Sequence, residues 1–197
     1  MAKRKDYSVE RTKRVFDDFF KVDEALVRHR RFDGQMSAPS RYLVLERGDS
    51  VAALLYNTDT KKIVLINQFR FATAAKDTGW MLETVAGILE EGERPEEAIR
   101  REIVEEAGYE AVRLEHIHTF FVSPGGSSER IILFYAEVSD ASRRDDGGGL
   151  DEEAEDIEVL HLGPNVAFAK MHEGAIRDAK TLVALMWFQR YLQDSPD

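Results

Sequence analysis

The sequence of 197 residues contains no cysteine. This absence excludes disulfides, thiolate metal sites and cysteine nucleophiles, and it is compatible with a cytoplasmic location, which we predict. Basic residues are also scarce, because 27 lysines and arginines stand against 37 acidic residues and the formal net charge is −10. A surface of this sign repels nucleic-acid backbones, so we expect no nucleic-acid partner.

Long apolar runs are absent as well. The longest one, residues 182–188, is far too short to cross a bilayer, so we expect no membrane segment. The basic residues Lys3, Arg4 and Lys5 are followed by polar residues and not by an apolar stretch, so they do not resemble a signal peptide. Their run is short and lacks aromatic residues, which favours a solvated terminus over a binding role.

A hydrophobic content of 43% over this length is enough for one domain with a small appendage. We predict that residues 1–47 form an N-terminal antiparallel β-sheet and that residues 48–197 form the main domain. Turn residues at Asp33, Gly34 and Pro39 separate the later strand-like runs of the first segment. Its earliest strand-like run contains Val15, Phe16, Phe19 and Phe20.

The main domain alternates strand-like and helical patterns. Helices are predicted from Pro95 to just before Gly108, over residues 166–172, and from Asp178 as N-cap to Gln193. Strands flank the first helix on both sides, which predicts an α+β fold, an α/β/α sandwich with a mixed sheet. The strands are predicted at residues 51–56, 63–69, 80–85, 114–122, 130–138 and 157–162.

A long loop over residues 139–153 contains the three consecutive glycines 147–149. Loops of this length inside a domain are usually functional or disordered. Two interpretations stay open. Either the glycines give the loop freedom to swing its acidic residues over a substrate, or the loop is a mobile surface segment.

The most specific pattern is residues 87–109, GILEEGERPEEAIRREIVEEAGY. Glu102 and Glu106 stand four apart on the predicted helix with Glu105 beside them, so three carboxylates share one surface. Each pair of like charges costs roughly 0.2–0.5 kcal/mol, which a cation would offset. Oxygen ligands without cysteine indicate a hard ion, Mg²⁺ with Mn²⁺ as the alternative.

An acidic helix alone would be ordinary solvated surface, but the complete spacing is far more specific. It matches by chance on the order of once in a hundred million windows. This spacing is the signature of the Nudix hydrolases, which the chain resembles, and the resemblance implies the Nudix fold and a diphosphate bound through divalent metal. The fixed positions are Gly87, Glu93, Arg101, Glu102, Glu105, Glu106 and Gly108.

We call residues 87–109 the box. Residues outside the box indicate which branch of the family the chain resembles. Pro124 lies fifteen residues after Tyr109, as in the ADP-ribose pyrophosphatase branch. The chain is also similar to the GDP-mannose pyrophosphatase branch, which implies that a nucleoside diphosphate sugar is cleaved to nucleoside monophosphate and sugar phosphate. Residues 41–43 depart from the relatives' basic-basic-Glu, so the choice of nucleoside stays open. The similar segments are residues 54–58, 68–70, 147–160 and 176–181.

The resemblance also assigns roles within the site. Glu153 is the expected general base, and Glu105 is the alternative, because other Nudix enzymes use a glutamate of the box. A glutamate with a pKa near ~4.3 is ionised at neutral pH, so the base needs no upward shift. Arg101 is expected to orient the box carboxylates, with Glu93 as its partner. The expected metal ligands are Glu102, Glu106, Glu155 and the carbonyl oxygen of Ala86.

Substrate contacts and a partner follow from the same resemblance. For Arg70 and Lys180 a surface ion pair is an equal alternative to phosphate or sugar binding. His116 and His118 share a strand face without a further ligand, and we interpret them as structural. The N-terminal strands are too few to be stable alone, which predicts a homodimer with sites built partly in trans. The expected substrate contacts are Arg41, Arg70, Gly87, Glu129 and Lys180.

The sequence also bears on two rival functions. Hydrolysis of nucleoside triphosphates, or isomerisation of a diphosphate, is disfavoured by Pro124 and by the N-terminal sheet. A catalytically silent module that senses nucleotides would be expected to have a broken box, whereas this box is whole. The fold alone would not decide among these functions.

Overall fold

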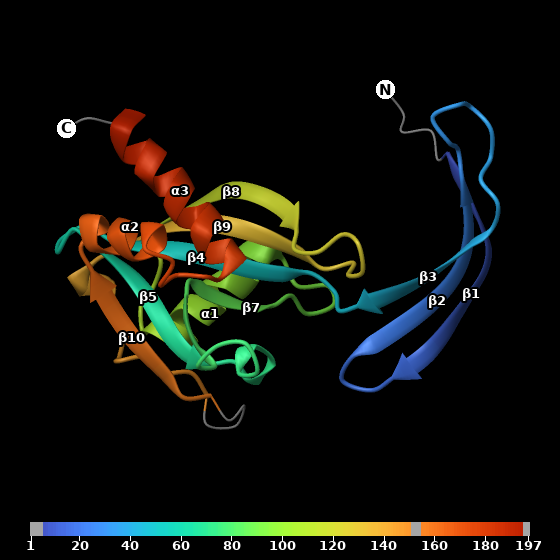
Figure 1. Cartoon of the computed structure of the whole chain (residues 1–197). Helices are drawn as coiled ribbons and strands as arrows, with labels where there is room; N and C mark the ends of the chain where they lie inside the picture. Colours follow the sequence, from blue (N-terminus) through green and yellow to red (C-terminus); the bar gives the residue numbers. More distant parts are fainter. Residues whose placement is uncertain (1–5, 151–154, 195–197) are drawn as a thin grey trace. The chain divides into compact units, whose positions relative to one another are not determined.

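The computed structural model describes residues 6–150 and 155–194. The chain forms two compact units, and most of their helices and strands are labelled in Figure 1. The first unit comprises Met1–Gly48 together with Phe121–Arg130, and the second comprises Asp49–Phe120 together with Ile131–Asp197.

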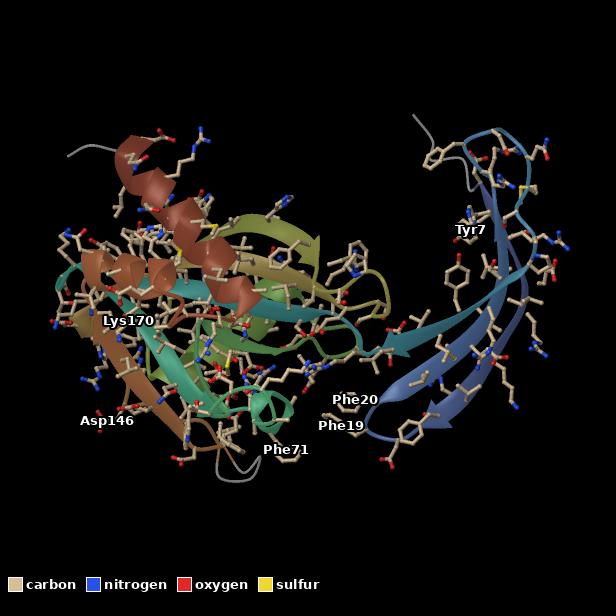
Figure 2. The ribbon with its side chains drawn as sticks, in the orientation of Figure 1. Tyr7, Phe19, Phe20, Phe71, Asp146 and Lys170 are labelled. Atoms are coloured by element: carbon tan, nitrogen blue, oxygen red, sulfur yellow. The ribbon has the colours of Figure 1, made fainter. Side chains whose placement is uncertain are left out.

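The first unit contains a three-stranded antiparallel sheet in the order β1-β2-β3. This confirms the predicted N-terminal antiparallel sheet. The expected strand character of Phe19 and Phe20 is wrong, because β1 ends at Asp17 and both rings lie in the turn to β2 (Figure 2). The Asp18 carboxylate accepts a hydrogen bond from the Phe19 amide at 2.7 Å and so closes this turn. The strands are β1 Tyr7–Asp17, β2 Lys21–His29 and β3 Ser40–Glu46.

The Pro124 loop pairs with the end of β3 within the same unit. The Leu45 amide donates to the Gly126 carbonyl at 2.8 Å, and the Ser128 amide donates to the Leu45 carbonyl at 3.1 Å. A segment distant in sequence therefore belongs to the first unit.

The second unit is built on a seven-stranded mixed sheet. Its main path runs β10-β5-β4-β9-β8, in which β4 and β9 are parallel, while β6 pairs with β5 and β7 pairs with β4. The strands are β4 Ser50–Asn57, β5 Lys62–Phe69, β6 Trp80–Glu83, β7 Val85–Ile88, β8 Arg113–Phe121, β9 Arg130–Val138 and β10 Ile157–Leu162.

The prediction of one strand over residues 80–85 is wrong, because β6 and β7 are separated at Thr84. The Thr84 amide does not join a strand ladder but donates to the hydroxyl of Thr181 at 2.8 Å. Each half can therefore pair with a different neighbour, β6 with β5 and β7 with β4.

Helices cover both faces of this sheet (Figure 1). Helix α1 (Pro95–Ala107) packs on one face, and α2 (Pro164–His172) and α3 (Ala179–Asp194) pack on the other. Alternation along β4 supplies both cores, with Val51 and Leu55 toward α1 and Leu54 toward α2 and α3. The predicted α+β sandwich is confirmed. Across the described parts of the chain, no helix is both long and apolar enough to span a membrane.

The ends of α1 follow directly from sequence. Pro95 occupies the first turn, where its missing amide proton costs nothing, and Gly108 ends the helix with a φ of 74°. Asp178 caps α3 as expected, since its carboxylate accepts from the Thr181 amide at 2.9 Å. The signals at Pro95 and Gly108 set the two ends of the helix that carries the acidic residues of the box.

Candidate active site

Glu106 is a carboxylate on the buried face of α1. It continues the stripe formed by Ile99 and Ile103, and only 2% of its surface is exposed. Its Oε2 accepts a hydrogen bond from the Ala86 amide of β7 at 3.0 Å. Burial raises the pKa of Glu106 to about 8; the Ala86 bond lowers this pKa, and the charges of Glu102 and Glu155 raise it. An acid so buried among other acids is a place where a cation is strongly favoured.

Glu102 lies against the backbone of β7 because position 87 is glycine. A Cβ atom there would lie 1.8 Å from the Glu102 Oε1. Burial raises the pKa of Glu102, and the nearby Arg101 lowers it. Gly87, expected among the substrate contacts, thus makes room for the carboxylate of a box residue.

Arg101 contacts three carboxylates around the box. Its guanidinium lies 2.9 Å from Glu102, 3.0 Å from Glu105 and 3.5 Å from Glu93. The structure thus places Arg101 and Glu93 together, as the sequence interpretation expected. Glu105 is a hydrogen-bond acceptor of Arg101 and keeps about a quarter of its side chain exposed.

Glu155 joins the box from the segment that precedes β10. Its charge acts on both Glu102 and Glu106, which places the three acids in one electrostatic environment. Its Oε2 accepts from the Leu150 amide at 3.2 Å. Glu153, the expected base, lies outside the described residues.

The donor set fits a hard divalent ion. All three side chains offer anionic oxygens, and Mg²⁺ and Mn²⁺ prefer such ligands. Each acid has its own partner, however: Glu102 bonds to Arg101, Glu106 to the Ala86 amide and Glu155 to the Leu150 amide. Within residues 6–150 and 155–194, no three acidic or histidine side chains yet surround a common point. An ion would therefore exchange some of these hydrogen bonds for coordination.

A second charged cluster surrounds Glu83 at the end of β6. Its side chain is 5% exposed and lies 2.9 Å from the Arg70 guanidinium and 3.0 Å from the Lys180 ammonium. Lys180 also lies 3.0 Å from Asp178. The structure thus brings together Arg70 and Lys180, two expected substrate contacts from distant parts of the chain.

Glu83 was not predicted as a site residue from the sequence. The signal for it was an acidic residue that directly follows the apolar residues Trp80, Met81 and Leu82. Burial lowers the pKa of Arg70, but Glu83, Glu106 and Asp178 raise it, and the net shift is upward. Arg70 therefore interacts electrostatically with both the Glu83 cluster and the box.

Gln68 is a further residue that sequence analysis did not single out. Its side chain is 7% exposed, and its Oε1 is buried without a hydrogen-bond partner in the described part of the chain. It pairs with Ile157 on β10 and with Met81 on β6. A buried amide oxygen of this kind is available to accept a hydrogen bond from a ligand or water.

Arg41 and Glu129 belong to the first unit. The Arg41 guanidinium donates to Glu24 at 2.6 Å, and the Glu129 amide donates to the Ser127 hydroxyl at 3.2 Å. Their contact with substrate stays a prediction. His116 accepts or donates a hydrogen bond with Thr119 at 3.0 Å and packs edge-on against Phe134, contacts that suit the structural role expected for it.

The family described as the NUDIX domain matches residues 46–182. The chain belongs to the Nudix family. The similarity inferred from the box is thereby confirmed, and the match covers the second unit up to the first turn of α3 as well as the end of β3.

Individual Nudix relatives match almost the whole chain. A GDP-mannose pyrophosphatase of Cronobacter sakazakii is 41% identical over 174 residues, which cover 87% of this chain and 84% of the relative. An ADP-ribose pyrophosphatase of Escherichia coli is 39% identical over 180 residues, 91% of this chain and 86% of the relative. A solved ADP compounds hydrolase has the same fold, with a TM-score of 0.73 over 95% of each chain at 18% identity.

Proposed function

We propose that this Nudix protein is a Mg²⁺-dependent hydrolase of nucleoside diphosphate sugars of the ADP-ribose or GDP-mannose type. It releases a nucleoside monophosphate and a sugar phosphate. The observation that carries the proposal is the whole box around the buried Glu106, on a chain similar to both kinds of pyrophosphatase over at least 84% of their length.

Glu102, Glu106, Glu155 and the Ala86 carbonyl would hold the ion. Mg²⁺, when bound, supplies positive charge to the phosphate oxygens and makes the attacking water easier to deprotonate, and Mn²⁺ is the alternative. Arg101 holds the Glu102 carboxylate at 2.9 Å and so limits its orientations. Burial of Glu106 excludes water from one side of the site.

Arg70 and Lys180 would bind the diphosphate or the sugar. Both are held on the buried Glu83, which orients them and cancels part of their charge. Arg70 keeps 38% of its side chain exposed, so donors of its guanidinium remain available to a ligand. Gly87, Arg41 and Glu129 complete the proposed substrate contacts.

Glu153 is the proposed base that accepts the proton of the attacking water. We expect Glu153→Gln to lower kcat by about 10²–10⁴-fold, the usual contribution of a general base. Glu105→Gln should keep most of the turnover, because Glu105 is already held by Arg101 at 3.0 Å. Steady-state kinetics of both variants test the assignment, and the reverse order of losses would move the role to Glu105.

The substrate class is tested by incubating the protein and Mg²⁺ with ADP-ribose, GDP-mannose, other nucleotide sugars and nucleoside triphosphates. Nucleoside monophosphate and sugar phosphate are the expected products, and chelation by EDTA should abolish their formation. Cleavage of triphosphates alone would contradict the proposal. A cytoplasmic location and the lack of a nucleic-acid partner stay predictions.

We also propose that the protein is a homodimer joined through the first unit. Its small sheet leaves many large apolar side chains exposed, and three strands alone rarely form a stable fold. Arg41 and Glu129 would then serve a site of the partner. The exposed apolar residues include Tyr7, Val9, Val15, Phe16, Phe19, Phe20, Tyr42 and Leu43.

A charged substitution in this sheet tests the dimer. We expect Phe16→Glu, at a residue 51% exposed, to convert the dimer into a monomer with strongly reduced activity, because burying a charge in the interface is costly. Met186→Glu on α3 is the matched control, since Met186 is 58% exposed and belongs to the other unit. Light scattering coupled to gel filtration gives the mass. A wild-type monomer would refute the proposal.

A further inference from the structure

The C-terminal end of α1 is covered by backbone groups of the loop that follows β9. A helix leaves its last carbonyl oxygens without partners inside the helix. Here the carbonyls of Glu105 and Glu106 accept hydrogen bonds from the amides of Gly149 and Gly148, both at 3.0 Å. The Gly108 carbonyl accepts from the Arg144 amide at 2.8 Å. We call residues 143–149 the clamp.

The clamp needs glycine because two backbones approach closely. Gly147 has a φ of +68°, and a Cβ atom there would lie 2.5 Å from the Glu106 carbonyl oxygen and 2.7 Å from the Ala107 carbonyl carbon. Gly108, which follows α1, faces the Asp145 carbonyl oxygen in the same way, since a Cβ atom there would lie 2.5 Å from that oxygen. These glycines permit close backbone contact between the clamp and the end of α1.

Backbone and side-chain contacts hold the start of the clamp. Arg143 forms an isolated antiparallel bridge with Tyr109, and its guanidinium lies 5.9 Å from the Tyr109 ring centre. Tyr109 is 2% exposed, and its hydroxyl lies 2.9 Å from the Nε2 of His161 on β10. The clamp is thus tied both to the end of the box and to the strand that follows Glu155.

The far end of the clamp and the adjacent Leu150 contact Glu155 and Ile157. The Ile157 amide donates to the Gly148 carbonyl at 3.2 Å, and the Glu155 amide donates to the Leu150 carbonyl at 3.3 Å. The Leu150 amide in turn donates to the Glu155 carboxylate at 3.2 Å. Gly149 also makes room, because a Cβ there would lie 2.5 Å from the Glu155 Oε2.

We propose that the clamp positions Glu155 against Glu102 and Glu106, and that Gly147 is the positioning residue on which this arrangement depends. The inference rests on the proposed function, in which Glu155 is a metal ligand. Backbone hydrogen bonds of the clamp thus set the position of Glu155 relative to the box. These hydrogen bonds reach the same helix turn that carries Glu105 and Glu106.

The test compares Gly147→Ala with Gly174→Ala. Gly174 also has a positive φ, of +77°, but nothing lies within 4 Å of its absent Cβ. Gly174→Ala therefore places an alanine at a similar backbone conformation without a steric clash. Mn²⁺ binding is measured on the substrate-free full chain from the electron paramagnetic resonance signal of the free ion. Amide hydrogen exchange over residues 143–150 reports the clamp itself.

We expect Gly147→Ala to weaken Mn²⁺ binding about 10-fold, the order of effect seen when residues supporting a ligand are changed. Glu155→Gln should weaken it at least as much, and the double variant no further, because Gly147 acts through Glu155. Exchange should accelerate over residues 143–150 and not over α1. Gly174→Ala should bind Mn²⁺ as the wild type does.

A folded Gly147→Ala with wild-type Mn²⁺ affinity, beside a weakened Glu155→Gln, overturns the clamp and leaves the proposed function standing. Unchanged binding in both variants removes Glu155 from the ligands and the clamp with it, while the substrate panel still decides the function. If Gly147→Ala does not fold, Gly148→Ala replaces it. Gly148 has a φ of +120°, which strains an alanine, but its nearest neighbour lies 3.8 Å from the absent Cβ, so there is no clash. We therefore expect Gly148→Ala to lower the Mn²⁺ affinity about 3-fold. Unchanged affinity there also overturns the inference.

Discussion

Glu106→Gln is expected to abolish hydrolysis and, at alkaline pH, to make the metal-free protein more stable. Loss of a proposed metal ligand should lower kcat by about 10³-fold or more, since the charge supplied to the phosphates is worth several kcal/mol. Glutamine keeps an oxygen that can accept the Ala86 amide bond, now 3.0 Å long. The variant therefore removes the buried charge and little else.

The gain in stability follows from the raised pKa of Glu106. Burial moves this pKa from its ordinary value of 4.5 to about 8, so between these two values the folded chain holds a proton that the unfolded chain has lost. The free energy of unfolding of the metal-free protein therefore falls as pH rises from 4.5 to about 8, and stays low above it. Glutamine has no such penalty. We expect a gain of about 2 kcal/mol at high pH, well under the ~1.4 kcal/mol per pKa unit of the full shift.

Urea unfolding with EDTA at pH 5 and pH 9 measures this effect. The variant and the wild type should differ at pH 9 and agree closely at pH 5, where Glu106 is protonated in the folded chain. Glu105→Gln is the matched control, because Glu105 is partly exposed and paired with Arg101, so its effect on stability should be small. Destabilisation of Glu106→Gln at pH 9 would show that Glu106 is not a buried uncompensated acid.

Glu83→Gln is expected to lower the free energy of unfolding by about 3 kcal/mol and to raise KM. Removing one partner of a buried ion pair leaves the other less compensated, and here Arg70 and Lys180 share the Glu83 carboxylate while Lys180 keeps Asp178 as its remaining partner. Lys180 is 13% exposed and bears most of this cost, while solvent screens Arg70, which is 38% exposed. KM should rise because Arg70 and Lys180 repel one another once Glu83 is neutral.

Thermal and urea unfolding together with steady-state kinetics measure both effects. Asp194→Asn, which removes the partner of Arg190 in a pair with 67% and 80% of the side chains exposed, should cost less than about 0.5 kcal/mol. Adding Lys180→Met to Glu83→Gln should restore part of the lost stability, because it removes the charge that Glu83 no longer compensates. A neutral Glu83→Gln would mean that solvent, and not Glu83, compensates these cations.

The box and its helix were largely predictable because their signals are local. Pro95 and Gly108 mark the two ends of α1 through their own backbone preferences, and the spacing of Glu102 and Glu106 puts them on one face. The burial of Glu106 was missed, although it lies three residues after Ile103 on the apolar stripe. Burial depends on the packing of β7 over the helix, which no local pattern contains.

The Glu83 cluster was hidden for a non-local reason. The run of residues 80–85 predicts one strand, but β6 and β7 pair with different neighbours and divide at Thr84. That division is stabilised by Thr181, which lies 97 positions away in sequence. Arg70 and Lys180 were nominated from their places after a strand and at the start of a helix and from segments that resemble the family, and their common partner could be found only in the folded chain.

The glycine-rich loop shows a different limit. Composition cannot distinguish a glycine that confers freedom from one that permits close backbone contact, since both need only the missing Cβ. Residues 147–149 adopt positive φ, Gly148 and Gly149 donate to the end of α1, and a Cβ at Gly147 would lie 2.5 Å from the Glu106 carbonyl oxygen, so close backbone contact is present here. The expected strand through Phe19 and Phe20 failed for a similar local reason, because the Asp18 carboxylate closes a turn there.

The contact between Lys180 and Glu83 also bears on biosynthesis. Glu83 is translated long before the lysine that neutralises it, and Thr181, which bonds Thr84, emerges later still. A nascent chain that stops short of α3 therefore carries a half-compensated carboxylate beside the box. The Glu83 cluster can therefore form completely only after α3 has left the ribosome. Premature termination anywhere upstream of Lys180 should yield an inactive product that is sensitive to proteolysis.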